Sequence, residues 1–132
     1  MKALPLILAS TLLAACADLP AGVTRHLEGE VFYLQRMALS PSAILSVSLQ
    51  DVSLADAPAV ELARQQGPVA GQVPLAFRLD YAAAKVQPNH SYAVSARIEL
   101  DGKLMFISTE QHSVKLDGTD PQPLRIKVDP VR

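Results

Sequence analysis

The sequence contains one cysteine and no tryptophan, and aromatic side chains make up only 5% of its 132 residues. A chain with a single thiol forms no internal disulfide and no multi-cysteine metal site. So few aromatic rings leave little from which to build a surface that stacks bases or sugar rings. The formal net charge of −1 gives no reason to expect a polyanionic partner. Nucleic acid is therefore not an expected ligand.

The N-terminal residues have the pattern of a secretory signal. Met1-Lys2 provides a charged start, and residues 3–15 are apolar and end in small side chains. This stretch is too short to remain as a membrane-spanning anchor. We therefore expect residues 1–15 to be a signal peptide, which leaves 117 of the 132 residues for one domain with a single hydrophobic core.

The end of this segment, Leu13-Ala14-Ala15-Cys16, resembles the lipobox of bacterial lipoproteins. The resemblance implies that the Cys16 thiol receives a diacylglyceryl group, that a peptidase cuts between Ala15 and Cys16, and that the new amine is acylated. Two or more acyl chains give stable anchoring, at about 0.8 kcal/mol for each buried methylene. The expected partner of Cys16 is thus a lipid bilayer, with the rest of the chain in water.

Two features place the anchor. Residues 16–24 include Pro20 and Gly22 and lack an apolar period, so we expect a lipidated tether there and the domain in residues 25–132. Lipoproteins retained in the inner membrane typically carry aspartate directly after the cysteine, whereas here Ala17 comes first and Asp18 second. We expect the periplasmic face of the outer membrane, and Asp18 leaves the inner membrane open.

Strand patterns dominate the domain. Residues 45–50, 73–79 and 92–100 alternate apolar and polar side chains, which is typical of strands with one face in a core. In the first of these segments Ser46 and Ser48 fall on the face expected to be in water, and continued alternation would place Val52 and Leu54 there too unless a bulge intervenes.

Further strands are expected at residues 26–35, 60–64, 103–108, 112–116 and 124–128, although helix stays open for 60–64 on propensity. Asp101-Gly102 predicts a two-residue hairpin turn, because both residues tolerate the positive φ that this turn requires. One helical turn is expected near residues 82–85. About seven short strands separated by turns indicate an all-β antiparallel β-sandwich, with a closed eight-stranded barrel as the alternative.

Chemical motifs are absent from the sequence. His26, His90 and His112 lie on separate segments without metal-ligand spacing, so we interpret them as surface or strand-end residues. No serine lies in Gly-x-Ser-x-Gly. The scattered acidic residues are better explained by turns than by paired-carboxylate catalysis: Asp56, Asp80, Asp101, Asp117 and Asp120. We expect no enzyme activity, metal, cofactor or small-molecule substrate.

The run Leu104-Met105-Phe106-Ile107 is apolar on both faces of its strand. The favoured interpretation is a central strand covered on two sides. The alternative is that one side, with Met105 and Ile107 or with Leu104 and Phe106, belongs to a groove that docks a partner.

Several segments together resemble the YbaY/YscW-type lipoprotein domain. They are residues 49–60, 29–31 with 36–39, 73–77, 92–98 and 105–108. The resemblance covers nearly all of the chain after Cys16 and implies a β-sandwich without catalysis. The family includes lipoproteins of unassigned role and pilotins of type III secretion systems, which bind the secretin subunit and help it reach and assemble in the outer membrane.

From this resemblance we expect a monomeric, outer-membrane-anchored periplasmic lipoprotein that acts as a pilotin and chaperone for a type III secretion secretin. The alternative is an envelope lipoprotein of YbaY type with a structural or maintenance role and no secretin partner. The resemblance identifies no functional residue besides Cys16, so the partner-binding residues stay unknown from sequence.

Overall fold

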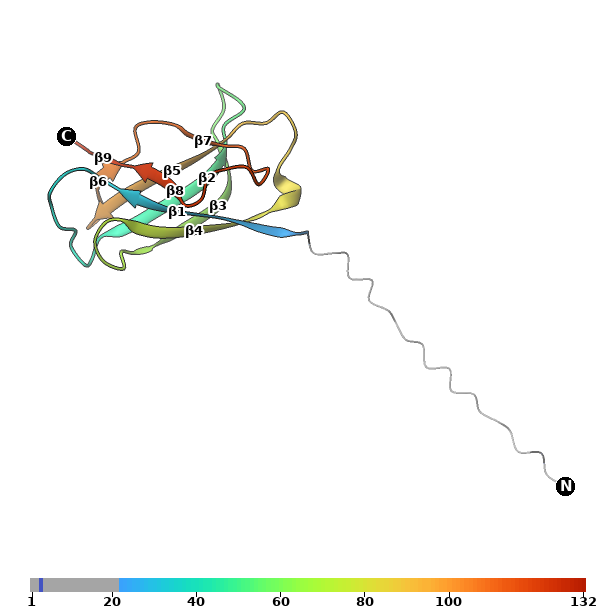
Figure 1. Cartoon of the computed structure of the whole chain (residues 1–132), viewed down its shortest axis with the longest axis horizontal. Coiled ribbons are helices and arrows are strands. Elements are labelled where there is room, and N and C mark those ends of the chain that lie inside the picture. The colour runs from blue at the N-terminus through green and yellow to red at the C-terminus, as the bar shows by residue number, and fades with distance from the viewer. Residues whose placement is uncertain (1–2, 4–21) are drawn as a thin grey trace.

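The alternating segments of the sequence form strands in two facing β-sheets (Figure 1). The computed structural model describes Ala3 and residues 22–132. The signal peptide, the Ala15–Cys16 cleavage site and most of the tether lie outside the described residues, so these expectations stay predictions. Strand β1 begins at Thr24, one residue before the expected start of the domain.

The strands agree closely with the expected segments, except that β9 was not expected. They are β1 (Thr24–Phe32), β2 (Ile44–Asp51), β3 (Val60–Pro68), β4 (Leu75–Ala82), β5 (Tyr92–Leu100), β6 (Lys103–Ile107), β7 (His112–Val114), β8 (Leu124–Lys127) and β9 (Asp129–Pro130). The expected helical turn is a short 3₁₀ helix, η1 (Ala83–Lys85). Residues 60–64 form a strand and not a helix, and this strand continues beyond the expected end at Arg64 to Pro68.

The sheet topology confirms the β-sandwich and corrects one detail. One sheet has the order β4-β1-β8, and the other has the order β3-β2-β5-β6-β9 with β7 also paired to β5. The two sheets are separate, so the closed barrel is not the fold. The pairing of β1 with β8 is parallel, whereas we expected antiparallel strands throughout. Short strands separated by turns do not reveal this pairing, because its partners are about a hundred residues apart in sequence.

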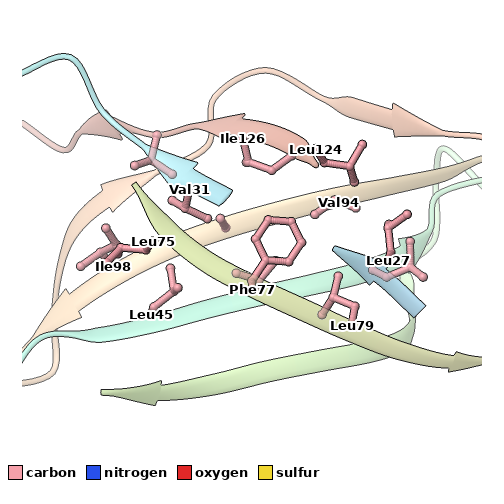
Figure 2. Packing of buried hydrophobic residues seen from close by; sticks show 14 of the residues in the cluster. Leu27, Val31, Leu45, Leu75, Phe77, Leu79, Val94, Ile98, Leu124 and Ile126 are labelled. Atoms are coloured by element: carbon pink, nitrogen blue, oxygen red, sulfur yellow. The ribbon is translucent and has the colours of Figure 1, made fainter. Parts of the chain in front are cut away.

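The core lies between the sheets, where the apolar side chains of both inner faces meet. Figure 2 shows the Phe77 ring in the middle of this cluster, with Val94 and Ile98 from the larger sheet nearby. Phe77 and Ile98 are 4% and 0% exposed, so the alternation read from the sequence correctly identified the buried face of β4 and β5.

The hairpin between β5 and β6 turns at Asp101 and Gly102, as predicted. Their φ angles of 52° and 78° are both positive, which is the geometry of the favoured two-residue turn. Asp80, which we expected in a turn, instead lies within β4, where its carboxylate accepts a hydrogen bond from Arg78 Nε at 3.0 Å.

The outer face of the larger sheet differs from the sequence expectation. Ser46 and Ser48 were expected in water, yet they are only 6% and 7% exposed. β2 lies between β3 and β5, and its short serines pair across the sheet with longer residues, Ser48 with Arg64 and Ser46 with Arg97. Small polar side chains in the middle of a sheet are covered when their cross-strand neighbours are long.

The described residues contain only the short η1 helix and no helix long and apolar enough to cross a membrane.

Candidate functional site

A largely apolar hollow lies at the end of the sandwich where β1 begins. We call it the end groove. It has a volume of about 480 Å³ and is lined by Asp51, Ser53, Leu54, Pro58, Val60, Glu61, Leu62, Ala84, Lys85, Gln87 and His90. The groove thus joins three parts of the chain that are distant in sequence: the β2–β3 loop with the start of β3, η1, and the β4–β5 loop.

Two large apolar side chains in the groove are exposed without a covering partner. Leu54 is 73% exposed and Val60 is 65% exposed. The alternation in the sequence had already placed Leu54 on the polar side of its segment, and β2 in fact ends at Asp51 before reaching it. Leu54, an apolar residue on the face expected to be in water, was therefore a sequence signal of the end groove. The sequence did not show which other segments line the groove with Leu54.

A β-bulge shapes the groove wall. The pairing of β2 with β3 shifts between Leu49 and Gln50, so that Ala63 lies opposite Leu49 and Glu61 lies opposite Gln50. Leu62 is the extra residue of β3, and its side chain lines the groove while packing partly against the core. A bulge turns the strand and changes which side each following residue faces.

Hydrogen bonds around Asp51 hold the loops at the groove rim. Ser53 donates to Asp51 Oδ1 from its backbone N–H at 3.0 Å and from its hydroxyl at 2.5 Å. His90 Nδ1 lies 2.6 Å from Oδ2, and because a carboxylate only accepts, Nδ1 carries the hydrogen. The backbone N–H of Ser91 donates to Ser53 Oγ at 2.8 Å, which links the β4–β5 loop to the β2–β3 loop.

These contacts make the rim sensitive to acid. The Ser53 hydroxyl and then His90 lower the pKa of Asp51 from its ordinary value of 3.8 to about 2. A carboxylate with a lowered folded-state pKa stabilises the fold above its unfolded pKa, and this contribution is lost as the pH falls toward the folded value. We expect Asp51→Asn to be less stable than the wild type at pH 5, with the difference shrinking between about pH 4 and pH 2.

Urea unfolding of both proteins across this pH range measures the difference. Asp56→Asn is the matched control, since Asp56 is an exposed carboxylate of the same loop and lines no part of the groove. A stability difference for Asp51→Asn that stays unchanged down to pH 2 would contradict the lowered pKa of Asp51 in the folded protein.

The chain enters the domain beside the groove. The backbone N–H of Ala83 donates to the Val23 carbonyl at 2.9 Å, and Gly22 lies against the Ala84 side chain. Ala84 itself lines the groove. Figure 1 shows η1, drawn in yellow, at the same end of the sandwich as the start of β1. The chain that directly precedes β1 therefore joins the sandwich beside this groove.

The other residues considered from the sequence do not converge. His26 lies on β1, His90 at the groove rim and His112 on β7, and in residues 22–132 no three metal-ligating side chains gather. Asp117 and Asp120 form turns: Asp117 accepts from the Thr119 N–H at 2.9 Å, and Asp120 accepts from the Lys115 N–H at 2.8 Å.

The apolar run 104–107 lies in β6, which pairs with β5 and β9. Phe106 is 1% exposed and stacks on Tyr33 with ring centroids 4.4 Å apart. Ile107 is 37% exposed on the outer face, so the interpretation that both sides are covered holds for Phe106 and fails for Ile107.

Comparison with known proteins gives a consistent result. A family model described as "Type III secretion system lipoprotein chaperone (YscW)" matches residues 23–126. The uncharacterized lipoprotein YbaY of Escherichia coli (strain K12) is 41% identical over 102 residues, which cover 76% of this chain and 54% of YbaY. The chain thus spans about half the length of this curated relative.

A solved structure, that of an alternative pilotin from the type II secretion system of Vibrio cholerae, is also similar. It is 42% identical with a TM-score of 0.78, and the match covers 83% of this chain and 99% of that chain. The β-sandwich fold is therefore shared with a protein described as a pilotin.

Proposed function

Because the chain belongs to the YscW family of type III secretion system lipoprotein chaperones, we propose that it is a pilotin. It binds a secretin subunit in the periplasm and helps that subunit reach and assemble in the outer membrane. Cys16 carries the lipid after cleavage next to Ala15, and the domain carries the binding site. The activity requires binding and delivery, with no catalysis, cofactor or small-molecule substrate.

The observation that carries the proposal is the end groove. Its exposed leucine and valine are available to bury against a partner, and burying such a side chain contributes about 1.5–3 kcal/mol. An amphipathic helix presents one apolar stripe, which would bury against the exposed Leu54 and Val60 side chains. We propose that the groove binds an amphipathic segment of the secretin and hides its apolar face from aggregation.

Binding at a free strand edge is less favoured by the geometry. The edge strands β3 and β4 lie beside each other at one corner of the sandwich, where the Arg78 N–H donates to Gln65 Oε1 at 2.7 Å. A side chain that already occupies this edge hinders an added strand. The groove therefore supports the proposal better than the edge does.

The position of the groove suits delivery to a membrane. From Cys16 to Gly22 the chain advances six residues, which span at most about 20 Å when fully extended. A segment held in the groove would therefore stay close to the bilayer that holds Cys16. Because Ala17, and not aspartate, directly follows Cys16, we propose that the protein lies on the periplasmic face of the outer membrane. We propose that it acts there as a monomer.

The secretion system served by the secretin is the finer part of the proposal. The family description names type III secretion, and the similar solved structure is a pilotin of type II secretion. We propose a type III secretin and treat a type II secretin as an outcome of the test. The second candidate function is an envelope lipoprotein without a secretin partner, since YbaY is described as a lipoprotein and not as a pilotin.

A charge placed in the groove tests its role. We expect Leu54→Asp to weaken capture of the secretin at least about tenfold, because a carboxylate would have to lose water against an apolar partner. The measurement is a pull-down from membrane extract of the same organism, with partners identified by mass spectrometry and binding then titrated on the recovered segment.

Leu34→Asp is the matched control. Leu34 is 70% exposed, close to the 73% of Leu54. It comes two residues after β1 ends at Phe32, whereas the groove lies where β1 begins. Figure 1 shows β1 running from that end of the sandwich toward the other. Equal loss in both variants would show that the groove is not the site. If the folded wild type captures no secretin, the envelope-lipoprotein alternative replaces the pilotin function.

A further inference from the structure

A second hollow lies on the outer face of the larger sheet, and the proposed function does not use it. We call it the serine pocket. It has a volume of about 180 Å³ and is lined by Ser46, Ser48, Gln50, Arg64, Ser95, Ala96, Arg97, Ile107 and Ser108. Its polar lining consists of hydroxyls, one side-chain amide and two guanidinium groups. No carboxylate lines it.

Cross-strand register builds the pocket. Ser48 lies opposite Arg64 on one side and Ser95 on the other, and Ser46 lies opposite Arg97. The small serines form the floor, and the long arginines rise on two sides. The Ser48 and Ser95 hydroxyls are 3.0 Å apart and hydrogen-bonded to each other. A row of short polar side chains between long cationic ones leaves a polar hollow of the size of one small group.

The arginines are held in place from outside the pocket. Glu61 accepts two hydrogen bonds from Arg64, from Nε and Nη2, each at 2.8 Å. Residues three apart in a regular strand point to opposite faces, and it is the bulge at Leu62 that brings Glu61 and Arg64 to the same face. Arg97 Nε lies 3.1 Å from Glu99 Oε1. Each guanidinium has five N–H groups, so donors remain on both after these contacts.

One hydroxyl in the pocket has no partner. Ser46 is only 6% exposed, and its buried Oγ makes no hydrogen bond to the described residues. An unsatisfied buried hydroxyl costs free energy and is rare in folded proteins. A ligand acceptor that reached the pocket floor would satisfy it.

We propose that the serine pocket binds a carboxylate carried by an acidic segment of a partner protein. Planar guanidinium groups and hydroxyl donors match the two oxygens of a carboxylate, and the pocket is small enough for one such group. The tether joins β1 in the other sheet, so this face lies away from the attachment point of the chain and favours a protein over a lipid headgroup. The inference does not depend on the pilotin function, because no residue that lines the serine pocket also lines the end groove.

Matched peptides test the pocket on the mature chain with Cys16→Ser, which cannot be lipidated. The probes are the capped peptide Gly-Asp-Gly and its neutral counterpart Gly-Asn-Gly, added at equal ionic strength. We expect only the acidic peptide to give saturable NMR shifts of the arginine Nε–H signals of Arg64 and Arg97, with weak affinity as befits a small ligand. Equal responses to both peptides, or none, would overturn the proposal.

Variants locate the site and separate it from general charge attraction. Arg64→Gln and Arg97→Gln should each weaken binding about tenfold, the effect of losing one charge-assisted hydrogen bond. Arg78→Gln is the control, since Arg78 is ion-paired in the same manner on the other sheet. Ser46→Ala should weaken binding several-fold without lowering the melting temperature, because it removes an unsatisfied group.

Two further outcomes would overturn the assignment. Binding unaffected by Ser46→Ala would show that the peptide meets the arginines at the surface and not in the pocket. Binding to phosphatidylglycerol vesicles that Arg64→Gln abolishes, with no response to the acidic peptide, would assign the site to a lipid headgroup instead.

Discussion

Replacing Gly29 by alanine is expected to lower the free energy of unfolding by about 2–3 kcal/mol, near the upper end of overpacking effects. Gly29 lies in β1 with its missing side chain directed at the core. A Cβ there would lie 2.6 Å from the Leu124 carbonyl oxygen and 2.6 Å from Phe77 Cζ. One of these contacts is with backbone, which cannot move aside without disturbing the parallel pairing of β1 and β8.

Urea denaturation followed by circular dichroism measures this loss. Gly67→Ala is the matched control, because Gly67 is also a strand glycine and a Cβ there would meet nothing within 4 Å. We expect it to change stability little, or to raise it by a few tenths of a kcal/mol through a less flexible unfolded chain. Equal destabilisation by the two substitutions would show that the close packing of Gly29 against Leu124 and Phe77 is not the cause of the lost stability.

Local patterns predicted the parts of the fold that local physics determines. The Asp101-Gly102 turn formed with both φ angles positive, and β5 has the bounds Tyr92–Leu100 that its alternation indicated. In both cases the deciding interaction lies within a few residues: backbone sterics at the turn, and the two-residue period of a strand with one buried face.

Features that depend on distant neighbours were not predictable in the same way. The burial of Ser46 and Ser48 depends on which strands flank β2, and a single strand does not identify its neighbours. The extension of β3 through Gly67 likewise depends on pairing, since Gly67 lies opposite Leu45 of β2. Pairing overrides the tendency of Gly67-Pro68 to end a strand.

The end groove depends partly on a local sequence pattern and partly on neighbours that are distant in sequence. Leu54 was identifiable from sequence as an apolar residue at a polar position, but η1 and the rim at His90 come from other parts of the chain. The hydrogen bonds of Asp51 with Ser53 and His90 bring these parts together. A surface made from three segments is visible only once the fold has placed them. The lipobox is a local motif, so the membrane anchor is a prediction that the sequence alone supports.

That local motif leads to the prediction with the largest expected effect. We expect Cys16→Ser to move the protein from the membrane fraction to the soluble periplasmic fraction almost completely, because stable anchoring needs two or more acyl chains and serine offers no thiolate to accept them. Cell fractionation, with mass spectrometry of the mature N-terminus, measures the change. Ser10→Ala, within the expected signal peptide, is the control and should stay in the membrane fraction.

The same variant separates capture from delivery. The substitution changes none of the residues that line the end groove, so the Cys16→Ser protein should keep its melting temperature and still bind the secretin segment with unchanged affinity. Assembled secretin in the outer membrane should nevertheless fall, because the captured subunit no longer travels with a lipid anchor. Normal secretin assembly in cells that carry only the soluble variant would show that the lipid on Cys16 is not what brings the partner to the membrane.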